Sequence, residues 1–229
     1  TLKTLPDQPI SFSVDDKTFA IEISAGDGKY KLSGENGEDF PKIPVVENPS
    51  SVAMPASVLS EAINKTLFAV SGDELRPAMT GVYCQLSPQH ITFVATDAHK
   101  LVRYRRLDTK SEAPATFILP KKALTLLKAS LPSDDVSVAV EYNNTSAFFR
   151  FGNINLICRL IDERYPDYEA VIPTNNPNKL IIDRSLFLNC LRRVVIFANK
   201  TTHQVRLKTS GSELNISSED IDFANEAHE

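Results

Sequence analysis

The residues best suited to chemistry lie in one short run, Thr96-Asp97-Ala98-His99-Lys100. A carboxylate and an imidazole two positions apart could act as a general acid–base pair, which makes Asp97 and His99 the candidates for a hydrolase site. The run also suits a tight turn, because an aspartate side chain accepts hydrogen bonds from the backbone two residues on. No metal-ligand spacing, glycine-rich phosphate loop or nucleophile elbow accompanies it in the sequence, so catalysis is the weaker interpretation.

Two apolar strands are predicted to hold this run. An apolar stretch ends at Ala95, and alternating apolar and basic residues resume at Leu101. The alternation places Val94 and Val102 in a core and leaves His99 and Lys100 at the tip. The residues alone therefore indicate a structural corner between two strands.

Composition limits the classes to which the chain can belong. It has 229 residues, is 42% hydrophobic and carries a net charge of −4, which at first sight argues against a nucleic-acid partner. Cys84, Cys158 and Cys190 lie far apart, so we expect reduced, buried thiols, no metal site and no cofactor. There is no membrane-length apolar run, secretory leader or initiator Met, so we expect a cytoplasmic chain cut from a longer protein, with no membrane partner.

Hydrophobic spacing predicts three helices and many short strands. Apolar residues recur at helical intervals over residues 55–71, 120–131 and 184–199. A stretch at residues 40–44 is predicted to be an extended linker. Strands are predicted at 10–14, 18–23, 29–32, 82–86, 91–95, 100–107, 116–119, 136–140, 147–151, 155–160, 179–183, 205–209 and 214–218.

The chain repeats itself at a domain-sized period. Similar patterns start at residues 81 and 204, at 10 and 136, and at 40 and 165. Repeated matches near one period indicate repeated domains. We expect an incomplete first domain at 1–46, a complete one at 47–173 and an incomplete third at 174–229. In the complete copy the order strand–helix–strands occurs twice, which predicts an α+β fold with pseudo-twofold symmetry.

Basic residues are concentrated on the predicted helices. Seven are found there against one acid, Glu61, although the whole chain is acidic. The apolar side of each helix must face its sheet, so the basic side faces away. Helices on a common side would form a positive stripe that attracts phosphates without reading bases. The basic residues are Lys65, Lys121, Lys122, Lys128, Arg184, Arg192 and Arg193.

Three sequence motifs carry a resemblance to a known family. They are Ser60-Glu61-Ala62-Ile63, Arg76-Pro77-Ala78-Met79-Thr80-Gly81 and Ala95-Thr96-Asp97-Ala98-His99-Lys100-Leu101. Together with the repeats and helix positions, they resemble the β sliding clamps of bacterial DNA polymerase III, most closely those of Bacteroidetes-type bacteria. The resemblance implies the DNA-clamp fold, in which two protomers close head to tail into a ring. Helices line the hole and sheets form the outer wall.

The resemblance also implies a function. Such a clamp is a non-catalytic processivity factor that encircles duplex DNA without sequence preference. It tethers the polymerase III alpha subunit, the clamp-loader delta subunit, and other polymerases and repair proteins through their clamp-binding peptides. The rival hypotheses are a peptide-binding module without a DNA role and, less favoured, the Asp97/His99 hydrolase.

Two sets of site residues follow from the resemblance. This sequence departs from the family pattern at Ala170, where many relatives carry a basic residue, and at Thr202, where some carry an aromatic one. It also has Pro77 and Ala78 where relatives use aromatic residues to touch DNA. The implied peptide cleft, with an apolar pocket for a leucine or phenylalanine anchor, comprises Met79, Thr96, Ala98, His99, Lys100, Leu101, Pro166, Ala170, Val171 and Thr202. The implied DNA-facing residues are Lys65, Arg76, Lys121, Lys122, Lys128, Arg192, Arg193 and Lys200.

Overall fold

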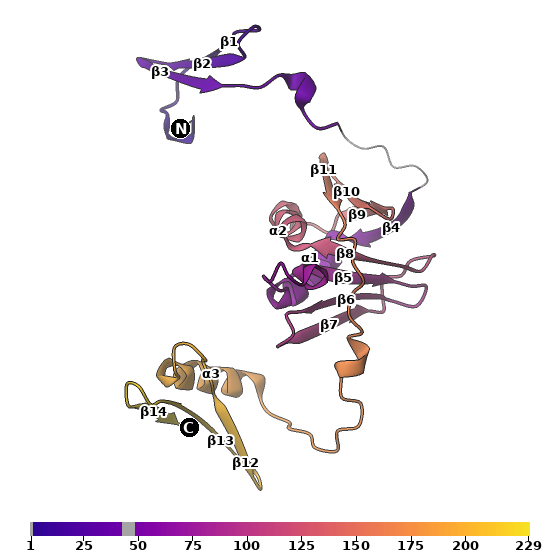
Figure 1. Cartoon of the computed structure of the whole chain (residues 1–229), viewed down its shortest axis with the longest axis vertical. Helices are drawn as coiled ribbons and strands as arrows, with labels where there is room; N and C mark the ends of the chain where they lie inside the picture. Colours follow the sequence, from indigo (N-terminus) through magenta and orange to yellow (C-terminus); the bar gives the residue numbers. More distant parts are fainter. Residues whose placement is uncertain (1, 43–48) are drawn as a thin grey trace. The chain divides into compact units, whose positions relative to one another are not determined.

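The computed structural model describes residues 2–42 and 49–229 (Figure 1). The chain divides into two compact units, Thr1–Pro166 and Asp167–Glu229. The first unit contains an N-terminal sheet and a middle domain. The predicted linker at 40–44 runs into residues 43–48, which lie outside the described part.

The N-terminal sheet is a simple antiparallel meander. Strands β1 (Ile10–Val14), β2 (Ala20–Ala25) and β3 (Gly28–Ser33) pair in that order, between short 3-10 turns η1 (Leu2–Thr4) and η2 (Gly37–Asp39). Asp15 shapes the first hairpin, because its Oδ1 accepts hydrogen bonds from the backbone N–H of Lys17 and Thr18 at 2.8 and 2.9 Å. The three strands predicted here are confirmed.

The middle domain has two halves with the same order of elements. The first half comprises β4 (Ser50–Pro55), α1 (Ala56–Thr66), η3 (Leu67–Ala69), η4 (Pro77–Thr80), β5 (Gly81–Leu86), β6 (Ile91–Thr96) and β7 (Leu101–Arg106). The second half comprises β8 (Ala115–Pro120), α2 (Lys121–Ser130), β9 (Ser137–Tyr142), β10 (Ser146–Phe151) and β11 (Ile154–Arg159). The predicted strand–helix–strands order is thus confirmed twice.

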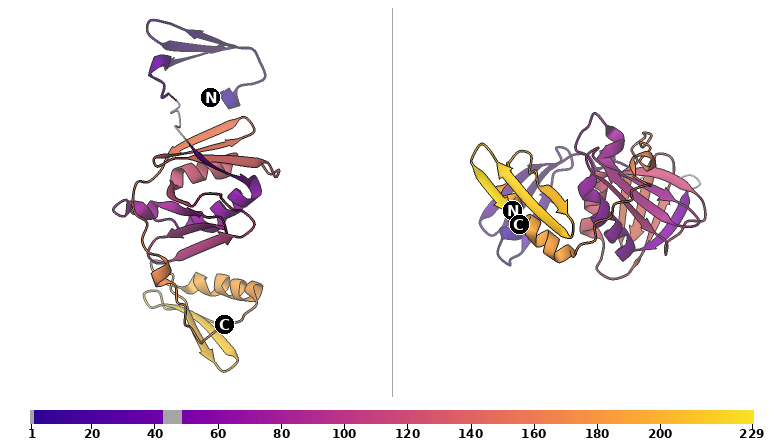
Figure 2. Two further views of the ribbon diagram at one scale, coloured as in Figure 1. Left: turned by 90° about the vertical axis from the view of Figure 1, so that its right-hand side faces the viewer. Right: turned by 90° about the horizontal axis from the view of Figure 1, so that it is seen from below.

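The two halves exchange their first strands. One sheet has the order β7-β6-β5-β8 and the other β11-β10-β9-β4, so β8 joins the sheet of the first half and β4 joins that of the second. Helices α1 and α2 contact each other, as Figures 1 and 2 show. This arrangement is the predicted pseudo-twofold symmetry.

One hydrophobic core lies between the helices and the two sheets. Its most deeply buried large side chains include Leu59 of α1, Leu127 of α2 and Phe149 of β10. Each helix turns its apolar residues to this core, as its 3.6-residue spacing requires. Cys84 is buried within the core and Cys158 is half-buried, and both are free thiols whose pKa values are raised by burial, that of Cys158 to about 11.

The C-terminal unit is a helix on a three-stranded sheet. It contains η5 (Glu169–Val171), α3 (Arg184–Val194), η6 (Val195–Phe197), β12 (Arg206–Ser210), β13 (Glu213–Asp220) and β14 (Asn225–His228). Asp183 caps α3, because its Oδ1 accepts a hydrogen bond from the backbone N–H of Leu186 at 2.8 Å. Cys190 and Val194 of α3 pack against Ile216 of β13.

Several sequence-based expectations need correction. The strand predicted at 179–183 is wrong, because these residues adopt no regular structure and Ile181 is 94% exposed. In the middle domain the equivalent strand β4 is held by β9, and the C-terminal unit contains no counterpart of β9. Strands β4 and β14 were not among the predicted strand ranges, although the repeated strand–helix–strands order implies a strand at the position of β4. The helices are shorter than predicted, since α1 and α3 end in the 3-10 turns η3 and η6.

No helix in the described part of the chain is both long and apolar enough to cross a membrane.

Candidate functional site

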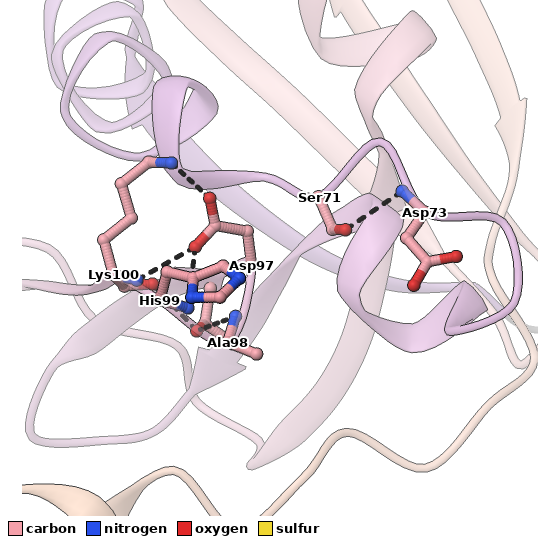
Figure 3. A network of polar contacts seen from close by, with 7 residues as sticks. Ser71, Asp73, Asp97, Ala98, His99 and Lys100 are labelled. Carbon is pink, nitrogen blue, oxygen red and sulfur yellow. Dashed lines mark hydrogen bonds and ion pairs between the residues drawn. The ribbon is translucent and has the colours of Figure 1, made fainter. Parts of the chain in front are cut away.

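The run singled out in the sequence forms a tight, fully bonded turn between β6 and β7 (Figure 3). Thr96 anchors it: its Oγ1 donates to the carbonyl of Lys100 at 2.8 Å and accepts from the N–H of Ala98 at 3.1 Å. The Oδ1 of Asp97 accepts from the N–H groups of His99 and Lys100 at 3.1 and 2.9 Å. The predicted turn is therefore confirmed, and it presents His99 to solvent.

The turn forces Ala98 into an unfavourable backbone conformation. Its φ is +72°, in the left-handed region that side chains with a Cβ rarely occupy. The bonds made by Thr96 and Asp97 on either side hold it there. The tip is consequently a strained, well-defined surface and not a loose loop.

The Asp97 carboxylate bonds to groups within the turn itself. Its Oδ2 forms an ion pair with the ammonium group of Lys100, and this contact, together with the two backbone N–H bonds, holds the pKa of Asp97 well below its usual range. The carboxylate bonds to the backbone of His99, not to its imidazole. An acid–base pair needs the carboxylate to orient the ring, so this geometry does not support the hydrolase hypothesis. Among the described residues, no cluster of three or more histidine, cysteine or acidic side chains could hold a metal ion.

Several predicted cleft residues meet at one end of a middle-domain sheet. Thr96 at the end of β6 pairs with Leu101 at the start of β7. The β5–β6 register directs the start of β5, at Gly81, to the same end of the sheet. Met79 lies just before it in η4, where its carbonyl accepts from the N–H of Ser71 at 2.9 Å. Met79 and Leu101 are both half-buried, so each keeps an accessible apolar surface.

Pro166 is tied to the same sheet by an aromatic stack that the sequence did not reveal. The ring of Tyr165 lies on that of Tyr83, with centroids 4.6 Å apart and planes 5° from parallel. Tyr83 belongs to β5, so the stack fixes the chain that follows β11. The sequence offered only two signals: an aromatic residue, Tyr83, in a predicted strand, and another, Tyr165, beside a proline.

The other predicted cleft residues belong to the C-terminal unit. Ala170 and Val171 lie exposed in η5, and Val171 is 68% exposed. Thr202 follows η6, and its backbone N–H donates to Oδ1 of Asn199 at 3.2 Å. The middle domain thus carries seven of the ten predicted cleft residues, and the C-terminal unit carries these three.

The predicted basic residues of the middle domain are all exposed. Lys65 projects from α1, and Lys121, Lys122 and Lys128 project from α2. The opposite sides of these adjacent helices are buried, so the lysines lie on the side away from the core. Glu61, the single acidic residue of the predicted helices, accepts a hydrogen bond from Nη1 of Arg106 at 2.7 Å.

Two of the predicted DNA-facing arginines already have acidic partners. Nε of Arg76 donates to Asp73 at 2.9 Å, and Nε of Arg193 donates to Glu229 at 3.1 Å. The ion pair with Glu229 raises the pKa of Arg193 and offsets its charge. Arg192 and Lys200 are exposed in the C-terminal unit. Arg76 and Arg193 are therefore weaker phosphate ligands than the lysines of α1 and α2.

Fold and site together define a class of protein. A duplicated strand–helix–strands domain, with two adjacent basic helices over two antiparallel sheets, is the DNA-clamp fold. The family model described as "DNA polymerase III beta subunit, central domain" matches residues 53–167, and the model of the C-terminal domain of that subunit matches residues 169–229. The chain belongs to the DNA polymerase III beta subunit family.

Curated relatives carry the same family name. The beta sliding clamp of Synechococcus elongatus is 30% identical over 200 residues, covering 85% of this chain and 53% of that protein. The beta sliding clamp of a Staphylococcus epidermidis strain is 32% identical over 214 residues, covering 93% and 56%. The chain spans about half the length of these relatives.

Solved structures show the same fold. The DNA polymerase sliding clamp of Bacillus subtilis matches all of this chain and 60% of its own, with a TM-score of 0.87 at 27% identity. A sliding clamp from Bartonella birtlesii, solved bound to griselimycin, matches with a TM-score of 0.86 at 28% identity and is covered to 62%.

Proposed function

We propose that this chain is part of a sliding clamp that encircles duplex DNA and keeps a replicative polymerase on it. The observation that carries the proposal is the cluster of exposed lysines on two adjacent helices of the middle domain: Lys65, Lys121, Lys122 and Lys128. Lysines on one smooth helical surface attract phosphates without reading bases, which a sliding contact requires. Membership of the beta subunit family supports this function.

The proposal extends to domains, assembly and location. Residues 1–46 are the end of a first clamp domain, 47–173 a complete second one and 174–229 the front of a third. Two protomers of the whole protein close into a ring in the cytoplasm, as a non-catalytic subunit of the polymerase.

We infer that partner proteins dock on the middle domain at Met79, Leu101 and Pro166. The remaining residues of the predicted cleft are Ala170, Val171 and Thr202 of the C-terminal unit. Apolar surface at the middle-domain residues would receive a leucine or phenylalanine side chain of a peptide from the polymerase alpha subunit, the clamp-loader delta subunit, or other polymerases and repair proteins. The Bartonella clamp bound to griselimycin suggests a direct probe of this chain. Griselimycin should shift the amide resonances of residues 96–101 in a nuclear magnetic resonance titration, whereas shifts elsewhere alone would place ligand binding on another surface.

The DNA role is tested by neutralising two pairs of basic residues. Lys121→Gln with Lys122→Gln removes two charges from α2, and Arg159→Gln with Lys208→Gln removes two from exposed sheet positions in β11 and β12, where neither side chain is ion-paired to a described residue. Binding of the 229-residue chain to a linear duplex is measured by fluorescence anisotropy at several salt concentrations. Each lost phosphate contact should reduce the salt slope by about 0.9, so the α2 variant should bind weakly and the sheet variant like the unaltered chain.

The outcomes separate the rival functions. Equal weakening by both variants would mean non-specific attraction with no DNA-facing helices. Absence of salt-dependent binding by the unaltered chain, combined with griselimycin shifts at residues 96–101, would favour a peptide-binding module without a DNA role.

A further inference from the structure

A groove of about 480 Å³ opens in the middle domain, away from the residues of the proposed peptide cleft. It lies where the end of β9, the start of β4, the edge of β8 and the chain after β11 meet. Such a volume is in the range of ligand-binding pockets. Its lining residues are Ser50, 114–118, Tyr142, Asn143, Asn144 and 160–163.

A buried hydroxyl in the wall of this groove lacks a partner. Tyr142 is 6% exposed, and its ring packs on Phe117 with centroids 5.0 Å apart. Its hydroxyl makes no hydrogen bond to any described residue. A buried polar group without a partner costs free energy, so a ligand that supplies a hydrogen bond to this hydroxyl would be favoured.

The groove also exposes an open strand edge. The carbonyl of Ile118 in β8 points away from β5, because it accepts a hydrogen bond from the N–H of Ile161 at 3.1 Å. The direction of the backbone polar groups alternates from residue to residue along an antiparallel strand. The N–H and carbonyl of Thr116, two residues before Ile118, therefore also point away from β5. No described residue bonds these two groups of Thr116. An added strand could use both.

The rim of the groove is acidic. Asp162 and Glu163 follow β11 and are exposed, and neither forms an ion pair with any described residue. Among the described residues, no basic side chain lines the groove. Its charge therefore favours a cationic occupant.

We propose that this groove is a second docking site, which binds an extended peptide segment containing an arginine or lysine. The peptide backbone pairs with Thr116, a polar group of the peptide bonds the hydroxyl of Tyr142, and the basic side chain lies beside Asp162 and Glu163. This is strand addition to a sheet edge, with specificity supplied by charge. The inference does not depend on the proposed function, since every residue involved lies in the middle domain and none belongs to the lysine cluster or the proposed cleft.

The test uses four small probes with the 229-residue chain. The first is acetyl-Thr-Val-Arg-Val-Thr-amide; the second replaces arginine with glutamate; the third carries N-methyl groups on both valines to remove backbone donors; the fourth is N-acetylarginine amide. Each is titrated into isotopically labelled protein while the amide resonances of Thr116 and Ile118 are followed. We expect the first to shift these resonances saturably, and the others to bind at least tenfold more weakly.

Two variants locate the site. Tyr142→Phe should fold with an unchanged or higher unfolding midpoint, because it removes only an unpartnered hydroxyl, and should bind the first probe about fivefold more weakly. Asp162→Asn with Glu163→Gln should weaken binding several-fold and flatten its salt dependence. Asp16→Asn with Asp27→Asn removes the same charge from exposed turns of the N-terminal sheet and should change nothing.

The proposal is overturned if the glutamate probe binds as well as the arginine probe, or if N-methylation has no effect. It is also overturned if N-acetylarginine amide matches the pentapeptide, which would indicate a small-cation site. A loss of stability in Tyr142→Phe would show that the hydroxyl serves the fold instead.

Discussion

Tyr165 lies flat on Tyr83, joining the segment after the last strand of the middle domain to the strand that follows η4. Tyr165 is 7% exposed, so the stack is part of the packed structure and not a surface contact. Because Pro166 is the next residue, the stack decides where this wall of the proposed cleft lies.

Replacing the stacked ring should loosen this wall. Tyr165→Leu should lower the free energy of unfolding of the middle domain by about 2–3 kcal/mol, since it removes a buried ring and its stacking partner contact. Tyr165→Phe keeps the ring and should retain most of that stability. Urea denaturation followed by tyrosine fluorescence measures both, and equal losses in the two variants would show that stacking is not what holds the segment.

Relieving the strain at the turn tip should stabilise the domain. Ala98→Gly removes the Cβ from a residue with φ of +72° and should raise the free energy of unfolding by about 0.5–1 kcal/mol, after allowing for the greater freedom of glycine in the unfolded chain. The control is Ala129→Gly in the exposed face of α2, which should lower it by about 1 kcal/mol. A loss of stability in both variants would contradict the strain assigned to Ala98.

The Asp97–Lys100 pair should make the turn sensitive to acid. The Lys100 side chain is the main cause of the lowered pKa of Asp97 in the folded state. The ionised carboxylate therefore stabilises the fold at pH values above the pKa of Asp97 in the unfolded chain, about 3.9. That contribution is lost as the pH falls through the lower, folded value. The destabilisation by Asp97→Asn should therefore be largest at neutral pH and shrink below about pH 3.9.

Two measurements check this dependence. Urea unfolding at pH 7, 4 and 2.5 gives the stability difference between Asp97→Asn and the unaltered chain. A carboxyl-carbon titration by nuclear magnetic resonance should show that Lys100→Met raises the pKa of Asp97 toward its ordinary range. An unchanged pKa in Lys100→Met would remove the ion pair as its cause.

Apolar residues at the sheet end should carry peptide affinity. Leu101→Ala and Met79→Ala each remove accessible apolar surface, which is worth about 25 cal/mol per Å² buried, and should weaken binding of a fluorescent peptide ending in leucine and phenylalanine about tenfold. Leu126→Ala removes a 53% exposed leucine from α2 and is the matched control. Equal affinity in all three variants would place the peptide elsewhere.

Periodic patterns predicted the elements well where each element's own residues decide its structure. The helices at α1, α2 and α3 follow from apolar residues at helical spacing, and the turn at Asp97 follows from side chain–backbone bonds within four residues. The duplication within the middle domain followed from the strand–helix–strands order, which occurs twice inside one repeat.

Elements that depend on distant partners were harder to predict. Residues 179–183 have a strand-like pattern without a neighbouring strand, whereas β4, which ends in Pro55, is a strand because β9 pairs with it. The cleft residues taken from the family resemblance remain predictions. The Tyr83–Tyr165 stack and the open edge at Thr116 arise only from tertiary structure, so the sequence pattern contained no signal for them.

The exchange of first strands between the two halves of the middle domain has a consequence for synthesis. As the chain leaves the ribosome, β5, β6 and β7 can form a meander early, but their sheet waits for β8. Among the strands of the middle domain, β4 emerges first. It stays without its partner until β9 follows, because Val52 pairs with Val140. Closing so long a loop is slow compared with forming a hairpin. The nascent domain therefore exposes a strand edge for most of its translation, and it completes its fold in one late, cooperative step.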